Sequence, residues 1–166
     1  MKADTIQSVT RPEHWAAFAQ LLQEYAANDL DQAHLSTIWK DLDDLPARYG
    51  SPHGGALLLQ RQGQALACGA FAPTRESDLC EIKRIYVRPA FRTQGLATRI
   101  LQALFQAAAQ AGYTHAALST WRHNNRSLAL YTRQGFAPVA PFKDHPNPDL
   151  LFLGRPLPHP NNRTPT

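Results

Sequence analysis

The residues best suited to binding a ligand lie between positions 92 and 98, where a predicted strand is followed by a predicted helix. The segment up to Val87 is rich in β-branched and aromatic residues, Pro89 cannot continue a strand, and Gly95 opens a run with apolar residues at helical spacing. The first N–H groups of a helix have no partner within it, and the helix dipole is positive there. Because Gly95 and Ala97 also permit close approach, we predict a phosphate-binding helix start.

Three segments together resemble a known family. Arg92, Gly95 and Ala97 match a signature of Gln or Arg, two residues, Gly, one residue, and Gly or Ala. The preceding strand reads Glu-Ile-Lys-Arg-Ile-Tyr-Val-x-Pro, and residues 124–136 read Asn-x-x-Ser-x-x-Leu-Tyr-x-x-x-Gly-Phe. The first signature alone would also fit an ordinary turn, but in this order the three resemble the GNAT superfamily of acetyl-CoA-dependent N-acetyltransferases, in a small single-domain bacterial form. The resemblance covers residues 55–153, and the N-terminal third matches only in its pattern of elements.

This resemblance implies a site for acetyl-CoA as co-substrate and no metal. The backbone N–H groups of Ile85, Tyr86 and Val87 would contact the acetyl carbonyl and the pantetheine arm, and we expect a β-bulge beside them. Asn124 would cap the next helix or contact the cofactor. The pyrophosphate would be wrapped by the loop and helix start, which are Arg92, Thr93, Gln94, Gly95, Leu96, Ala97 and Thr98.

The resemblance also implies two catalytic residues. Acetyl transfer to an amine requires deprotonation of the acceptor and stabilisation of the departing thiolate. Tyr131 would donate a proton to the leaving sulfur, since a phenol titrates near pH ~10 and is protonated at neutral pH. Glu81 would act as general base, through water. Each has a structural alternative: Tyr131 could simply pack beside Leu128. Glu81 could instead pair with Lys83 or Arg84, and a nearby cation would weaken it as a base.

The acceptor site would lie over Glu81, bounded by the first two helices, the strand end at Thr120–Trp121 and the final hairpin. Trp121 and Tyr49 could supply aromatic walls there or could be packed in the core. Several carboxylates could attract a cationic amine or could be solvated, namely Asp41, Asp43, Asp44 and Asp144.

Composition limits the class of protein. With 166 residues and 43% hydrophobic residues, we expect one domain over residues 1–157 and a flexible tail over 158–166. No apolar run approaches the ~18 residues of a membrane span and no signal sequence begins at Met1, so we expect a cytoplasmic protein that binds no membrane. Cys68 and Cys80 lack metal-ligand spacing and read as buried free thiols. The net charge of +4 suits an anionic ligand, and scattered basic residues argue against nucleic acid.

The remaining elements alternate strands and helices around this site. The first helix starts within residues 10–13 and places aromatic and aliphatic residues on one face up to Tyr25. Further helices are predicted over residues 36–45, 95–111 and 125–135, and strands over 5–9, 56–60, 65–71, 78–87, 114–120, 137–142 and 150–157. We predict an α/β (α+β) domain with a mixed, mostly antiparallel sheet of about seven strands, splayed near Val87, with helices on both faces. This is the acyl-CoA N-acyltransferase fold that the resemblance implies.

Two classes of function fit these residues. The first is an acetyl-CoA-dependent N-acetyltransferase acting on a primary amine of a small molecule, amino acid or peptide. Transfer would be direct, within a ternary complex, since neither cysteine has a nucleophile setting. The second is a non-catalytic acyl-CoA-binding regulatory module. The presence of both Glu81 and Tyr131 favours the enzyme, and a homodimer is expected only by analogy with the family.

Overall fold

The computed structural model describes residues 3–30 and 33–160. Its strands are β1 (Thr5–Ser8), β2 (Gly55–Arg61), β3 (Gln64–Pro73), β4 (Leu79–Val87), β5 (His115–Trp121), β6 (Ala137–Pro138) and β7 (Leu150–Pro156). Its helices are α1 (Pro12–Asn28), α2 (Ile38–Asp43), α3 (Leu45–Tyr49), α4 (Leu96–Gln110) and α5 (Asn125–Arg133), with 3-10 helices η1 (Ala33–Leu35) and η2 (Pro89–Phe91). The described strands form one sheet in the order β1-β2-β3-β4-β5-β7-β6, in which only β4 and β5 pair in parallel. The predicted mixed, mostly antiparallel sheet is confirmed.

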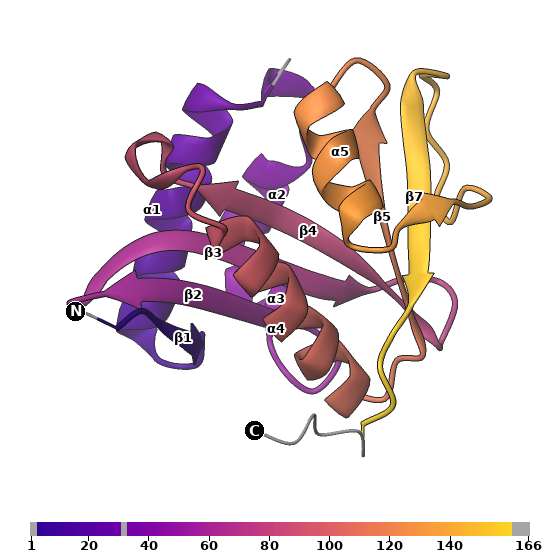
Figure 1. Cartoon of the computed structure of the whole chain (residues 1–166). Helices are drawn as coiled ribbons and strands as arrows, with labels where there is room; N and C mark the ends of the chain where they lie inside the picture. Colours follow the sequence, from indigo (N-terminus) through magenta and orange to yellow (C-terminus); the bar gives the residue numbers. More distant parts are fainter. Residues whose placement is uncertain (1–2, 31–32, 161–166) are drawn as a thin grey trace.

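Helices cover both faces of the sheet, as predicted. Figure 1 shows α4 and α5 in front of the sheet and α1, α2 and α3 behind it. The front core contains the apolar stripe of α4, including Ile100 and Leu104, packed on β2, β3 and β4. The back core contains Phe18 and Leu21 of α1 together with Tyr49 of α3. The sheet therefore separates two hydrophobic layers, and its residues divide between them by the alternation of a strand.

The two central strands separate where the acceptor site was predicted. β4 and β5 pair only from Leu79 opposite His115 to Glu81 opposite Ala117. Beyond Glu81 they diverge towards the upper edge of Figure 1, so the edge of β4 that faces β5 has no partner strand among the described residues. The predicted splay is confirmed, and it begins at Glu81 rather than near Val87. Free backbone groups on such an edge can pair with an extended ligand.

On the other edge of β4, a β-bulge at Arg84 and Ile85 interrupts the pairing with β3. Cys68 pairs with Tyr86 and Ala70 with Lys83, so Gly69 alone faces two residues of β4. The conformation is unusual, since Arg84 takes φ +63°. A Cβ at Gly69 would come within 2.7–2.8 Å of side-chain atoms of three residues, namely Ile85, Ile100 and Leu104. The expected bulge is thus present, and it depends on glycine in the opposite strand.

This bulge changes the face of the sheet that Arg84 occupies. In a regular strand Arg84 would share the front face with Ile82, against the apolar side of α4. The bulge instead leaves Ile85 in the front core and turns Arg84 to the back, where it contacts α2. Lys83 also lies on the back, where its ammonium contacts Thr37 beside α2. Two consecutive cations therefore point to the same side of the sheet.

Two predicted elements were wrong in extent. The helix predicted over residues 36–45 is two helices, because Asp44 accepts a hydrogen bond from the Ala47 amide at 3.1 Å and Pro46 occupies the first turn of α3. Pro46 is therefore compatible with the start of a second helix, where its missing amide costs no hydrogen bond. The strand predicted over residues 137–142 is limited to the two residues of β6, because Pro138 and Pro141 have no amide to donate to a ladder.

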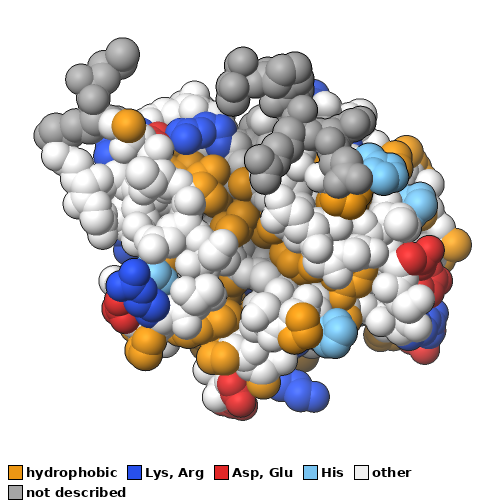
Figure 2. Space-filling model, turned by 90° about the horizontal axis from the view of Figure 1, so that it is seen from below, with side chains coloured by type: hydrophobic (Ala, Val, Ile, Leu, Met, Phe, Trp, Pro, Cys, Tyr) orange, Lys and Arg blue, Asp and Glu red, His pale blue; other side chains and the backbone are white. Residues whose placement is uncertain are grey.

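The lower end of the molecule, opposite to the divergence of β4 and β5, is shown in Figure 2. Hydrophobic side chains gather in a central depression of this face, and acidic and basic side chains lie towards its edges. Within residues 3–30 and 33–160 no helix is both long and apolar enough to cross a membrane. Most of the predicted tail, residues 161–166, lies outside the described residues.

Candidate functional site

The loop before α4 presents a series of unpaired backbone donors. The amides of residues 93–98 have no acceptor among the described residues. Thr93 at φ +67° and Gly95 at φ +76° turn the chain in the left-handed region, which is strained for a β-branched residue such as Thr93. A Cβ at Gly95 would meet nothing within 4 Å, so the space over the loop is open. Consecutive free amides at a helix start form an anion-binding nest.

The arginines that flank this loop are already paired. Arg92 donates to Asp29 at 2.6 Å and to the Val87 carbonyl at 3.0 Å. Arg88 forms a bidentate pair with Glu24 at 2.9 and 3.0 Å. These contacts fix the loop against α1. Because the guanidinium groups are already paired with carboxylates, an anion at this loop would be bound mainly by backbone amides. The two carboxylates, Glu24 on α1 and Asp29 at its C-terminal end, lie far from residues 92–98 in the sequence, so no local pattern could have indicated these pairs.

Tyr131 lies on α5 and packs into the front core. Its ring is edge-to-face with Phe136 at 5.7 Å between centroids. Its hydroxyl has no hydrogen-bond partner among the described residues. Burial, with a smaller contribution from the nearby phenol of Tyr25, raises the pKa of Tyr131 above its usual value. The residue therefore combines a packed ring with a protonated hydroxyl, and the predicted packing and proton-donor roles are compatible.

Glu81 stands at the last paired position before β4 and β5 separate. It is only 5% exposed, and its Oε2 accepts a hydrogen bond from the ammonium of Lys143 at 2.6 Å. The alternative pairing of Glu81 with Lys83 or Arg84 is wrong, because the ion pair of Glu81 is with Lys143 and that of Arg84 is with Asp41. Lys143 precedes β7 and lies 62 residues from Glu81 in the chain, so no local pattern could have indicated it.

Arg84 belongs to a buried network with α2 and α3. Its Nε and Nη2 donate to Asp41 Oδ2 at 3.0 and 2.8 Å, and the Tyr49 hydroxyl donates to the same oxygen. Burial opposes ionisation of Asp41, but Arg84, Tyr49 and Lys83 outweigh it and lower the pKa of Asp41 below its usual value. The predictions that Asp41 is solvated or attracts an amine are therefore wrong. Tyr49 is 1% exposed and is part of the core, not an acceptor wall.

The other acceptor-site candidates lie at the surface. Asp43, Asp44 and Asp144 are exposed, in agreement with the solvated alternative. Trp121 ends β5 half-buried, stacked on His123 at 6.2 Å and edge-to-face with His145 at 5.8 Å. Trp121 therefore keeps part of its ring accessible at the end of β5, unlike Tyr49.

Asn124 and the two cysteines occupy the structural positions that the sequence indicated. The side chain of Asn124 caps α5 by accepting the Ser127 amide at 3.2 Å. Cys68 and Cys80 are free and buried. Burial raises the pKa of Cys80 to about 12 and that of Cys68 well above its usual value, so neither is a thiolate at neutral pH. Among the described residues no group of three potential metal ligands is present.

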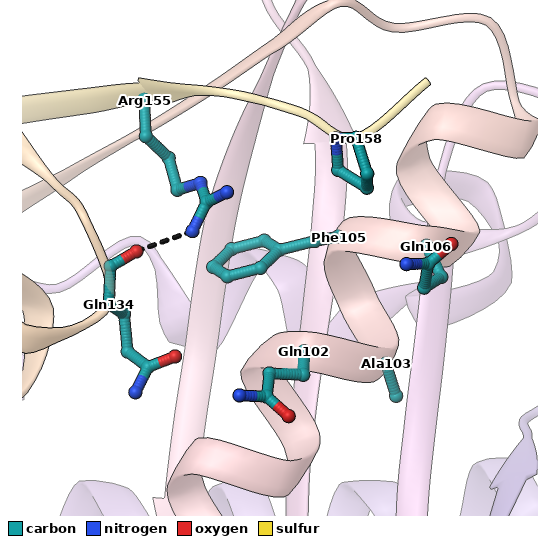
Figure 3. Close-up of a pocket in the computed structure, with 7 residues that line it drawn as sticks. All are labelled: Gln102, Ala103, Phe105, Gln106, Gln134, Arg155 and Pro158. Carbon is teal, nitrogen blue, oxygen red and sulfur yellow. Dashed lines mark hydrogen bonds between the residues drawn. The ribbon is translucent and has the colours of Figure 1, made fainter. Parts of the chain in front are cut away.

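The larger of the two described cavities, of about 520 Å³, lies elsewhere, on the outer side of α4. Figure 3 shows the Arg155 guanidinium over the Phe105 ring, 4.3 Å from its centroid, and donating to the Gln134 carbonyl. The other lining residues are Gln102, Ala103, Gln106 and Pro158. None of the residues predicted for cofactor or catalysis lines this cavity, so it does not mark the predicted site.

Residues 15–136 match the family model described as the acetyltransferase (GNAT) family. An uncharacterized N-acetyltransferase of Schizosaccharomyces pombe is 30% identical over 154 residues, 90% of this chain and 92% of the relative. An IAA acetyltransferase of Azospirillum brasilense is 35% identical over 61% of this chain and 67% of its own.

Solved structures show the same fold. A Salmonella typhimurium protein described as an acetyltransferase and solved with its cofactor acetyl-CoA has a TM-score of 0.74, with 20% identity over 95% of each chain. A Klebsiella pneumoniae protein described as an acyl-CoA N-acyltransferase has a TM-score of 0.64, with 31% identity over 95% of this chain and 98% of that one.

Proposed function

Since the chain belongs to the GNAT family of acetyltransferases, we propose that it transfers an acetyl group from acetyl-CoA to a primary amine of a small molecule, amino acid or peptide, directly within a ternary complex. The proposal rests on the row of unpaired amides at residues 93–98, next to a central strand that is free on one edge beyond Glu81. Anionic and peptide-like parts of one ligand could occupy these two features together.

The cofactor would be held mainly by backbone groups. The amides of residues 93–98 would bind the pyrophosphate, and those of Ile85, Tyr86 and Val87 would orient the pantetheine arm and polarise the acetyl carbonyl. Bound acetyl-CoA would supply the activated thioester. The buried, protonated thiols of Cys68 and Cys80 support direct transfer over a cysteine-bound intermediate.

Two side chains would move protons. Tyr131 would donate its phenolic proton to the departing sulfur, and its packed ring would hold the hydroxyl in place. Glu81 would accept a proton from the amine through a water molecule, with Lys143 fixing the carboxylate. As the ion pair also competes with proton uptake, Lys143 would have to move or share the carboxylate as the acceptor enters.

We expect amine-dependent release of CoA thiol when the protein is incubated with acetyl-CoA and a panel of primary amines. Glu81→Gln should lower kcat by about 10²-fold, because general-base catalysis contributes roughly this much, while acetyl-CoA still raises Tm. Thiol release follows turnover and thermal unfolding follows binding. A rise in Tm without turnover on any amine would favour the regulatory module, and no rise at all would refute the cofactor assignment.

The loop can be tested separately by comparing two glycines that both have positive φ and open space around an added Cβ. Gly95→Ala and Gly112→Ala each place an L-residue at positive φ, at +76° and +103°, where a Cβ meets no atom within 4 Å. Both should lower stability by about 1 kcal/mol. Only Gly95→Ala should also weaken acetyl-CoA binding, by about tenfold, because its methyl group would stand over the amides that face the phosphates. Calorimetric titration measures both affinities, and equal weakening in the two variants would count against this loop.

A further inference from the structure

Three charged side chains of β4 point to the back of the sheet where β4 separates from β5. Glu81 pairs with Lys143 at 2.6 Å, and Arg84 pairs with Asp41 at 2.8 Å. Lys83 lies between them in the chain and has no carboxylate within 4.0 Å among the described residues. Within the part of the chain that the structure describes, its one polar contact is with the Thr37 hydroxyl, at 3.5 Å. Strand alternation thus places one half-buried ammonium without a counter-ion on the same face as the candidate base.

The surroundings of Lys83 do not favour a bare charge. Burial lowers the pKa of Lys83 to about 8, and the positive charges of Arg84 and Lys143 act in the same direction. The negative charges of Glu81 and Asp41 oppose this shift but do not cancel it. The group is still largely protonated at neutral pH. Two cations, Arg84 and Lys143, stand near Lys83, and each already has its own carboxylate. An incoming anion would therefore restore the charge balance that the protein itself leaves incomplete.

Resting on the proposed function, we propose that Lys83 binds a carboxylate of the acceptor, and that the acceptor is an amino acid or a similar small molecule with its amine and carboxylate a few bonds apart. Glu81 and Lys83 are two residues apart on one face of β4, so their Cα atoms are about 6.6 Å apart. An acceptor lying along this face would present its amine to Glu81 and its carboxylate to Lys83. In this arrangement Lys83 determines specificity and takes no part in proton transfer.

The test is calorimetric binding to the CoA-saturated protein. The probes are a panel of amino acids and the matching amino acid amides, which keep the amine and lose the negative charge. Wild type should bind the best acid about tenfold to a hundredfold more tightly than its amide, the range of a charge-assisted contact. Lys83→Met should abolish this preference, and Lys83→Arg should keep it. Lys40→Met, on the exposed surface of α2, is the matched control and should leave it unchanged.

The preference should also fall as pH rises through about 8 in wild type, because Lys83 then loses its charge, and should persist in Lys83→Arg. Equal binding of acids and amides, a preference that survives Lys83→Met, or no binding of any acid would overturn the inference. Acetylation of amides as fast as acids would overturn it while supporting the acetyltransferase. Binding of acids without thiol release would support it while refuting the proposed activity.

Discussion

Tyr131→Phe is expected to lower kcat for acetyl transfer by about 10²-fold or more while leaving the affinity for acetyl-CoA unchanged. General acids contribute roughly this much, and phenylalanine keeps the ring that packs on Phe136 but removes the proton donor. The loss should appear in kcat, since the hydroxyl interacts with charge that develops on the sulfur only as the thioester breaks. Steady-state thiol release with saturating acetyl-CoA and amine measures this effect.

Tyr113→Phe is the matched control. That hydroxyl lies in the turn between α4 and β5 and donates to the His53 carbonyl at 2.7 Å, so its removal should cost about 1 kcal/mol of stability and no activity. The raised pKa of Tyr131 further predicts that its hydroxyl stays protonated through pH 10, without the loss of activity that an ordinary phenol would show there. Unchanged kcat in Tyr131→Phe would mean that water or another group protonates the thiolate.

Asp41→Asn is expected to lower the free energy of unfolding by about 3–5 kcal/mol, the usual cost of removing one partner from a buried ion pair. The variant would leave the Arg84 guanidinium buried without a negative charge and would disturb the hydrogen bond from Tyr49. For a chain of this length we expect Tm to fall by about 10 °C. Urea unfolding followed by circular dichroism measures the loss.

Asp43→Asn provides the control, because Asp43 lies on the same helix but is exposed. Its effect should stay within about 0.5 kcal/mol. The double variant Asp41→Leu with Arg84→Met should recover much of the loss, since an apolar pair needs no counter-charge. A similar loss in Asp43→Asn would show that charge on α2 in general, and not the buried pair, stabilises the domain.

Acid should act on the same pair. The pKa of Asp41 is lowered in the folded state, so its stabilising contribution is complete above its unfolded pKa near ~3.9 and is lost as pH falls towards the folded value. In Asp41→Asn this part of the acid dependence should be absent. The difference in stability between wild type and variant should therefore shrink below pH ~4.

Local patterns in the sequence determined much of the fold and the cofactor loop. The apolar spacing of α4 and the glycine at its start are features of neighbouring residues, and they predicted both the helix and the open amides before it. The same holds for Asn124, whose capping role requires only the residues that follow it. The alternation and apolar composition of the strands predicted the sheet. A strand buried on one face alternates apolar and polar residues, and a strand buried on both faces is apolar throughout.

The charges of the site were decided only by the tertiary structure. Lys143 pairs with Glu81 across 62 residues, and Asp41 pairs with Arg84 across 43. Such pairs depend on how strands are ordered and on how helices cross a sheet, and no local pattern of residues encodes either. The bulge adds a second cause, because one extra residue in β4 turns Arg84 from the front face to the back. Where alternation alone would have buried Arg84 in an apolar core, the bulge opposite Gly69 placed it beside Asp41.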